Sequence, residues 1–258
     1  MTDDPSEAAA AIFAKLDLTA IALLLDVDGT LIDIAPTPDA VHVSAELRFS
    51  LARLLDATGG ALVLVSGRPI ADLDRLFAPL SPPAIGGHGA EMHLRGTTAI
   101  RCAEALPADL RRKLTAAATA GSGILIEDKG YSLALHYRNA PRREDALRAH
   151  IAAAIAAFPN EALEVLPGKA VFEVKRPGVN KGAAVRRLMT HAPFAGRKPV
   201  FVGDDVTDES VFALLPALGG IGFSVSGYVQ GLAGMFTSPA DVRSALQTLA
   251  DRAPPPRP

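Results

Sequence analysis

The sequence predicts an α/β protein with a mostly parallel β-sheet, interrupted in its middle by a smaller α+β unit. Three observations lead to this prediction. Short apolar runs alternate with helical patterns, acidic residues directly follow two of those runs, and the alternation is lost between about residues 107 and 177. Alternating strands and helices are typical of parallel sheets covered by helices. A chain of 258 residues is long enough for a large domain with an insert.

The first half of the chain supplies the strand–helix alternation. Ile21–Leu25 is a continuous apolar run that ends in an acidic turn, which predicts a central strand buried on both faces. Ser44–Ala57 carries leucines at helical spacing, with Ser44 as the N-cap. Ala61–Val65 predicts a second buried strand. Asp72–Phe77 predicts a short helix, which the following prolines end.

The middle of the chain predicts a separate unit in the order helix, two strands, helix, two strands, with the strands as two antiparallel pairs. Its expected elements are Ala108–Ala120, Gly123–Glu127, Tyr131–Tyr137, Glu144–Ala157, Leu163–Leu166 and Ala170–Lys175. The earlier rhythm then resumes with a helix after Asn180 and the strand Pro199–Val202. We therefore predict a discontinuous core of residues 1–106 and 178–258 and an inserted cap domain of residues 107–177. The proline-rich tail from residue 253 to 258 is expected to be disordered.

Composition narrows the classes of partner. The formal net charge is only −2, so there is no electrostatic reason to expect nucleic acid or a membrane surface. Cys102 is the only cysteine, which excludes an internal disulfide. The first residues are acidic where a signal peptide would be basic, and the apolar runs are too short to span a bilayer. We expect a cytoplasmic monomer that acts on a small soluble substrate.

The strongest chemical signal is the pair Asp26 and Asp28, directly after the first strand. Ligands in open parallel sheets bind beyond the carboxyl ends of the strands. Two neighbouring carboxylates repel each other unless a cation lies between them, and oxygen ligands with few fixed protein donors suit Mg²⁺. A polar turn is the alternative. A calcium loop is excluded because Gly29 stands fourth in the motif, where such a loop has its glycine sixth.

A second acidic cluster follows the strand near residue 200. Asp204 comes directly after Gly203 at the strand end, and we predict it as a further metal ligand. Asp208 has two open interpretations, as a metal ligand or as an acidic residue that favours the start of the next helix.

Two weaker sequence signals indicate residues that could bind phosphate. Ser66 and Arg68 follow the second strand, where a hydroxyl and free backbone N–H groups can hold a phosphate oxygen, although an ordinary turn would look the same. Lys181 lies in the first turn of the helix that Asn180 caps. A cation there opposes the helix dipole, which makes Lys181 a functional candidate or a harmless exposed lysine.

In this order, the acid pair, the serine, the lysine and the acidic cluster resemble the four motifs of the haloacid dehalogenase superfamily of phosphatases. The resemblance implies a Rossmann-like core in which Asp26 attacks phosphorus to give an aspartyl phosphate. It implies that Asp28 protonates the leaving oxygen and then activates water, and that Ser66 and Lys181 hold the phosphate. Mg²⁺ would bind Asp26, Asp204 and the backbone carbonyl of Asp28, with Asp208 in or next to the metal shell.

Nearly the whole chain is similar to the trehalose-6-phosphate phosphatase family. The residues that carry this similarity are Gly87–Glu91, Glu127–Gly130, His136–Arg138, Pro167–Val174, Asn180–Gly182 and Gly203–Glu209. The resemblance implies a hydrolase that converts trehalose 6-phosphate to trehalose and phosphate. Val27 stands where the family often has an aromatic residue, and its side chain is expected to point away from the metal. No synthase-like domain is present, so the substrate is expected to arrive by diffusion.

The cap residues suit a sugar. Glu127 and Glu173 would accept hydrogen bonds from hydroxyls, and Lys129, Arg138 and Lys169 would donate to hydroxyls or phosphate. The alternative for each of these residues is that it is a solvated surface charge with no role in binding. His88, between two glycines in the core, is either a substrate ligand or a turn residue.

Other functions remain open at this stage. A phosphatase of sucrose phosphate or a hexose phosphate, a sugar phosphomutase and a non-catalytic sugar-phosphate sensor share parts of the pattern. If the chain is a phosphatase, the cap is expected to close over the core about linkers near Leu106 and Gly178.

Overall fold

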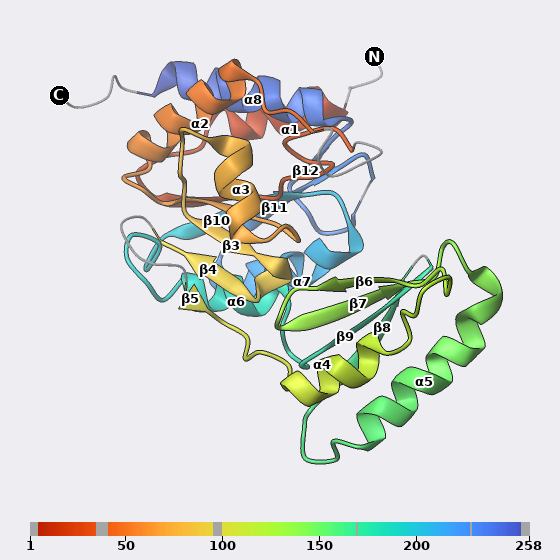
Figure 1. Ribbon diagram of the computed structural model, residues 1–258. Helices are drawn as coiled ribbons and strands as arrows, with labels where there is room; N and C mark the ends of the chain where they lie inside the picture. Colours follow the sequence, from red (N-terminus) through yellow and green to blue (C-terminus); the bar gives the residue numbers. More distant parts are fainter. Residues whose placement is uncertain (1–4, 35–40, 95–99, 169, 228, 254–258) are drawn as a thin grey trace. The chain divides into compact units, whose positions relative to one another are not determined.

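The computed structural model describes residues 5–34, 41–94, 100–168, 170–227 and 229–253 (Figure 1). The chain divides into two compact units. Unit 1 comprises Met1–Cys102 and Asn180–Pro258, and unit 2 comprises Ala103–Val179. Residues 254–258, most of the tail expected to be disordered, lie outside the described part of the chain. No helix in the described ranges is both long and apolar enough to cross a membrane.

Unit 1 contains an eight-stranded sheet with the order β12-β11-β10-β1-β2-β3-β4-β5. The first six strands in this order run parallel and the last two pair antiparallel, which confirms the predicted mostly parallel sheet. The strands are β1 (Ile21–Leu25), β2 (Leu62–Val65), β3 (Ala84–Gly86), β4 (Glu91–His93), β5 (Ile100–Arg101), β10 (Lys198–Gly203), β11 (Ile221–Val225) and β12 (Gly234–Phe236).

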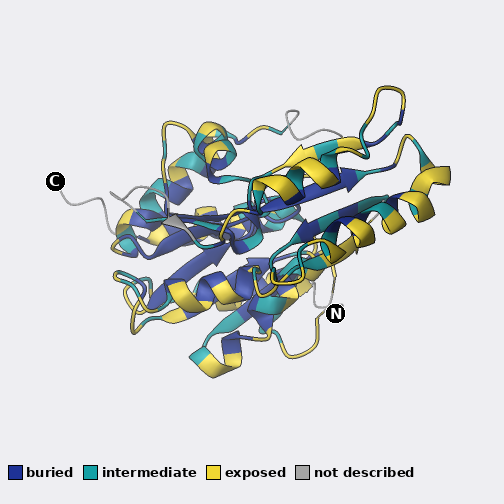
Figure 2. Ribbon diagram, turned by 60° about the horizontal axis from the view of Figure 1, so that its bottom comes forward, coloured by how far each residue is buried: buried dark blue, intermediate teal, exposed yellow. Residues whose placement is uncertain are grey.

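Helices cover both faces of this sheet (Figure 1). One face packs against α1 (Pro5–Phe13), α2 (Ala45–Ala57), α3 (Ile70–Phe77) and α8 (Pro239–Arg252), and the other against α6 (Lys181–Leu188), α7 (Glu209–Phe212) and the short 3₁₀ helix η5 (Leu215–Leu218). In β1, Leu23 and Leu25 join the first cluster while Ala22 and Leu24 join the second. A strand buried on both faces needs a continuous apolar run, as this sequence has. Figure 2 shows the strands of this sheet mostly buried and the outer sides of its helices exposed.

Unit 2 is one antiparallel sheet with two helices. Its order is β6-β7-β9-β8, so the two predicted strand pairs are confirmed and are joined through β7 and β9. The strands are β6 (Leu125–Asp128), β7 (Ser132–His136), β8 (Glu164–Gly168) and β9 (Val171–Lys175). The helices are α4 (Ala108–Thr115) and α5 (Glu144–Ala156), and α5 follows the 3₁₀ turn η3 (Pro141–Arg143).

The two helices cover one face of the unit 2 sheet. Leu133 and Leu135 of β7 pack against them together with residues of β9. The alternate residues of β7, among them Ala134 and His136, therefore lie on the opposite face. Through the strand register, Ala134 is flanked by Glu127 and Glu173. This face, which we call the open face, carries Glu127, Ser132, Ala134, His136 and Glu173.

Helix α4 is shorter than predicted, since it ends at Thr115 and not at Ala120. Its buried residues are Leu110 and Leu114, and only small residues follow them. The chain beyond continues in turns, with hydrogen bonds from Ala117 to Leu114 and from Ala118 to Thr115. Without a further large apolar residue, little burial holds another helical turn to the sheet.

Candidate active site

The acidic residues of unit 1 meet where two neighbouring strands end. Leu25 of β1 pairs with Val202 of β10, and the N–H of Asp26 donates to the carbonyl of Val202 at 2.9 Å. Asp204 directly follows β10. Because parallel strands place their carboxyl ends at one edge of the sheet, Asp26 and Asp204 lie at the same edge.

A tight turn directly follows β1 and carries Asp28. The carbonyl of Val27 accepts the N–H groups of Thr30, Leu31 and Ile32 at 3.3, 2.9 and 3.0 Å. The Val27 side chain is fully buried in the helix-covered core of the sheet. The turn therefore separates an inward Val27 from the aspartates on either side of it.

Gly29 is required in this turn by two observations. Its φ of +82° lies in the left-handed region that favours glycine. A Cβ at this position would lie 2.1 Å from Oδ2 of Asp204. Only a residue without a side chain lets the carboxylate from β10 pack against the turn from β1.

The centre of the site is a lysine between two aspartates. Nζ of Lys181 donates to Oδ1 of Asp26 and to Oδ1 of Asp208, both at 2.7 Å. The side chains of Lys181, Asp26 and Asp208 are only 3%, 5% and 0% exposed. Asn180 caps α6 by accepting the N–H of Ala183 at 2.8 Å, which holds Lys181 at the first position of the helix. Lys181 is therefore not a harmless exposed lysine.

Burial is the largest single influence on the pKa of each of these groups. It raises the pKa of Asp26 well above its usual value, against the attraction of Lys181, and the nearby charge of Asp208 raises this pKa further. Burial likewise raises the pKa of Asp208 and of Asp204. For Lys181, burial alone would lower the pKa, but Asp26 and Asp208 more than offset it, so the pKa is raised. The lysine is therefore held as a cation.

Asp208 makes the helix-start contacts that were one of the two interpretations left open by the sequence. Its Oδ2 accepts the N–H groups of Asp204 and Asp205 at 2.9 and 3.1 Å. With Asp205 as the N-cap it forms a capping box at the 3₁₀ turn η4 (Val206–Asp208). A Cβ on Gly203 would lie 2.5 Å from Oδ2 of Asp208, so glycine is needed there as well.

The donor set fits a divalent cation. One carboxylate oxygen each from Asp26, Asp204 and Asp208 lies within 4.8 Å of the others. Three carboxylates, of which those of Asp26 and Asp208 are buried, lie together near the single ammonium of Lys181, which leaves negative charge for another cation to balance. Within the described ranges, the Asp28 carboxylate is not part of this group. The Asp28 carboxylate is instead paired with Arg68.

The predicted phosphate loop follows β2. Ser66 is buried, and its Oγ accepts the N–H of Arg68 at 3.1 Å. The guanidinium of Arg68 donates from Nε to Oδ2 of Asp28 at 2.7 Å and from Nη2 to Oδ1 at 2.6 Å. His88, with φ of +53°, belongs to the 3₁₀ turn η2 (Gly87–Gly89) and packs its ring against Gly67. His88 thus supports this loop.

Three of the predicted cap residues meet on the open face of unit 2. Nζ of Lys129 lies 3.5 Å from Glu127 and 4.0 Å from Glu173. The structure does not bring Arg138 to them, because it lies exposed beyond the other end of β7. Lys169 lies outside the described residues.

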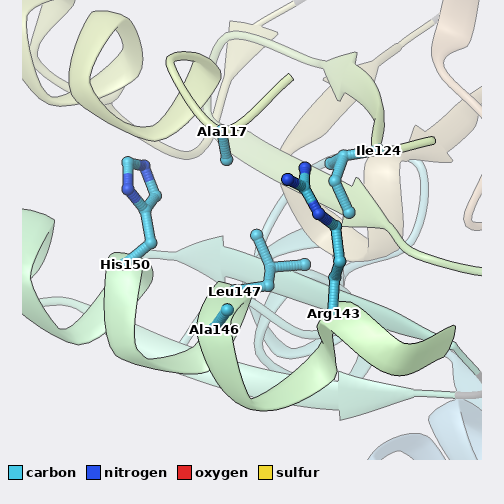
Figure 3. Close-up of a pocket in the computed structure, with 6 residues that line it drawn as sticks. All are labelled: Ala117, Ile124, Arg143, Ala146, Leu147 and His150. Carbon is cyan, nitrogen blue, oxygen red and sulfur yellow. The ribbon is translucent and has the colours of Figure 1, made fainter. Parts of the chain in front are cut away.

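Two cavities in the described part of unit 2 contain none of the predicted site residues. A cavity of about 180 Å³ lies against α5 and is lined by Ala117, Ile124, Arg143, Ala146, Leu147 and His150 (Figure 3). The second, of about 300 Å³, is lined by Arg148, Ile151, Ala152, Val165, Pro167 and Phe172.

Sequence reasoning proposed no role for three residues that make polar contacts in these sites. Thr30 donates from Oγ1 to Oδ1 of Asp204 at 3.1 Å, Glu91 accepts the N–H of Ile70 at 3.0 Å, and Ser132 donates to Glu173 at 2.7 Å. Glu91 stands inside the Gly87–Glu91 motif of the sequence analysis, and Thr30 directly follows Gly29 of the acid-pair motif. The contact of Ser132 follows from strand pairing alone and had no local signal.

Known proteins resemble this chain over most of its length. The family model for trehalose-phosphatase matches residues 24–228. A probable trehalose-phosphate phosphatase of Sinorhizobium fredii is 43% identical, over 81% of this chain and 79% of its own length. A trehalose-6-phosphate phosphatase of Escherichia coli is 42% identical, over 79% of this chain and 77% of its own. The solved C-terminal domain of Candida albicans trehalose-6-phosphate phosphatase shares the fold, with a TM-score of 0.71 at 22% identity, covering 94% of this chain and 96% of that domain.

Proposed function

Because this chain belongs to the trehalose-phosphatase family, within the haloacid dehalogenase superfamily, we propose that it hydrolyses trehalose 6-phosphate to trehalose and inorganic phosphate. This is the last step of trehalose biosynthesis. The observation that carries the proposal is the buried contact of Lys181 with Asp26 and Asp208 at the edge of the parallel sheet. It provides a nucleophile and a cation at one point, as phosphoryl transfer requires.

In the first step, an oxygen of Asp26 attacks phosphorus. The new bond joins that oxygen to phosphorus, and the bond between phosphorus and O6 of the sugar breaks. Asp28 donates a proton to O6, so that trehalose leaves as an alcohol. Asp28 lies two residues after Asp26, on the other side of the Val27 turn.

In the second step, water hydrolyses the aspartyl phosphate. Asp28 takes a proton from the water as its oxygen attacks phosphorus, and the bond to Asp26 breaks. The Asp26 carboxylate and inorganic phosphate are formed. A carboxylate nucleophile thus divides one difficult hydrolysis into two easier transfers.

Lys181 and Ser66 are proposed to hold the phosphate oxygens through both steps. The ammonium of Lys181 keeps its charge because two aspartates raise its pKa. Asp26, Asp204 and Asp208, with the backbone carbonyl of Asp28, would hold a Mg²⁺ ion. When bound, Mg²⁺ neutralises negative charge on the transferred phosphoryl group.

Unit 2 is proposed to select the sugar. Glu127 and Glu173 provide acceptors for sugar hydroxyls, and Lys129 between them provides a donor. Arg138 and Lys169 remain proposed contacts without structural support. His88 is better supported as a residue that holds the phosphate loop than as a substrate ligand.

The test is release of phosphate from trehalose 6-phosphate with Mg²⁺, beside sucrose 6-phosphate and glucose 6-phosphate, with Asp26→Asn as control. We expect turnover of trehalose 6-phosphate that the control lacks. Preference for another ester would retain the chemistry of unit 1 and reject the proposed role of unit 2. No turnover of any ester would favour a non-catalytic sensor.

We retain two further proposals from the sequence, that the enzyme is a monomer and that it works in the cytoplasm. Light scattering coupled to size-exclusion chromatography tests the first. Fractionation of cells that express the full chain tests the second.

A further inference from the structure

Asp28, the second aspartate of the acid pair in unit 1, forms an ion pair that the proposed mechanism does not explain. Nε and Nη2 of Arg68 both donate to the Asp28 carboxylate, one to each oxygen, at 2.7 and 2.6 Å. The side chains are 16% and 38% exposed. Two parallel hydrogen bonds between a guanidinium edge and a carboxylate fix the plane of the carboxylate as well as its position.

The backbone that carries Arg68 is itself held in place. Its N–H donates to Oγ of Ser66, and its carbonyl accepts the N–H of Gly87 at 2.9 Å. The carbonyl of Ser66 accepts the N–H of His88 at 3.0 Å. A Cβ on Gly67 would lie 2.4 Å from the His88 ring, so this loop is packed closely against η2. The backbone from which the guanidinium extends is therefore fixed.

The Asp28 carboxylate is held by fewer contacts than the backbone of Arg68. It lies in the turn after β1, and no other side chain in the described part of the chain is seen to bond its carboxylate. Since a displacement of about 1 Å of a reacting group can cost about 100-fold in rate, the orientation of this carboxylate matters for both of its proton transfers.

We propose that Arg68 is a positioning residue, which orients the Asp28 carboxylate for its acid and base steps instead of binding the transferred phosphate. This replaces the role as a substrate ligand expected from the sequence, and it rests on the proposed function. A lysine at position 68 would keep the charge but lose the planar pair of donors. Charge alone therefore should not restore the function.

The experiment compares two esters. Trehalose 6-phosphate has an alcohol leaving group that needs a proton, whereas p-nitrophenyl phosphate leaves without one. Values of kcat/KM report the first transfer for both, and the inhibition constant of inorganic phosphate reports phosphate binding. The variants are Arg68→Ala, Arg68→Lys, Asp28→Asn and the double variant Arg68→Ala with Asp28→Asn. Arg75→Ala is the control, since Arg75 is paired with Asp72 on the exposed side of α3.

We expect Arg68→Ala and Arg68→Lys to lower kcat/KM for trehalose 6-phosphate by about 100-fold. The loss for p-nitrophenyl phosphate should be at least about tenfold smaller, and the inhibition constant of phosphate should stay within about twofold, because Arg68 acts through Asp28. In the Asp28→Asn background, losing Arg68 should cost nothing more. Arg75→Ala should match the wild type.

Three results would overturn the proposal. They are equal losses on the two esters, weaker inhibition by phosphate in both variants, and losses that add in the double variant. Thermal unfolding of each variant identifies a failure to fold. If Arg68→Ala does not fold, the kinetics of Arg68→Lys test the proposal. If the wild type hydrolyses p-nitrophenyl phosphate and another alkyl phosphate but not trehalose 6-phosphate, the proposed substrate fails. The same comparison made with that other ester still tests Arg68.

Discussion

The two units both bring a lysine between two acidic residues, yet they enclose it very differently. In unit 1, Lys181 lies 2.7 Å from both Asp26 and Asp208, and all three side chains are buried. In unit 2, Lys129 lies 3.5 Å from Glu127 and 4.0 Å from Glu173, whose side chains are 51% and 23% exposed. Buried ion pairs are strongly coupled to their surroundings, while exposed pairs contribute little to stability.

We propose that this difference separates the chemistry of unit 1 from the selection of the sugar by unit 2. The buried cluster cannot rearrange without exposing an unpaired charge, which suits groups that must stay aligned through phosphoryl transfer. The partly exposed cluster can exchange its long contacts for sugar hydroxyls at low cost. Removing a charge should therefore have a large effect in unit 1 and a modest, substrate-dependent effect in unit 2.

The largest effect is expected for Asp26→Asn. The amide cannot serve as the nucleophile, so kcat for every ester should fall by at least about 1,000-fold. Release of phosphate from trehalose 6-phosphate and p-nitrophenyl phosphate measures it. Residual activity above a hundredth of the wild type on either ester would assign the nucleophile elsewhere.

The next largest effect is on stability. Lys181→Met would leave Asp26 and Asp208 buried without their cation, which should destabilise the metal-free protein by about 3–5 kcal/mol. Urea unfolding in EDTA measures this. The exposed Lys113→Met in unit 2 is the control and should change stability by less than about 0.5 kcal/mol. Equal changes would mean that the buried cluster is not coupled to folding.

A smaller effect is expected in unit 2. Glu127→Ala and Glu173→Ala should each raise KM for trehalose 6-phosphate about tenfold, equivalent to about 1.4 kcal/mol, by removing an acceptor for hydroxyls. Steady-state kinetics with p-nitrophenyl phosphate should be unchanged. Glu144→Ala on α5, which loses a surface pair with Arg148, is the matched control. A rise in KM for both esters would contradict the division of roles.

The smallest effect is on size in solution. We propose that unit 2 closes over unit 1 about linkers near Leu106 and Gly178 when substrate binds, as hinged lids do. Small-angle scattering should show a slightly smaller radius of gyration with Mg²⁺ and a non-hydrolysable substrate analogue than with Mg²⁺ alone. An unchanged radius would argue against closure.

Many of the strands and helices were predictable because they follow from local sequence patterns. The runs Ile21–Leu25 and Pro199–Val202 are strands in the structure, and Ser44 caps α2 through the N–H of Leu47. The short strands β3, β4, β5 and β12, the longer strand β11 and the helices α1 and α8 were not assigned. A strand of two or three residues is too short for a period to be visible.

Side-chain partners were much harder to predict. Asp28 and Arg68 are 40 residues apart, and nothing local distinguishes Arg68 from other arginines as the partner of Asp28. Their contact depends on β1 and β2 being neighbours in the sheet. Asp208 could be assigned to a metal or to a helix start from sequence alone. Only the structure shows that its carboxylate forms a capping box and also lies in the group of carboxylates that could hold a metal ion.

The insertion of unit 2 has a consequence for how this protein is synthesised. β1 pairs with β10, and Ile21 meets Lys198, 177 positions later (198 − 21). All four strands of unit 2 lie between Leu125 and Lys175. On the ribosome, unit 2 therefore emerges complete while β1 still lacks its central partner. We expect the insert to fold first, and the nucleophile to reach its lysine only when the last third of the chain has been translated.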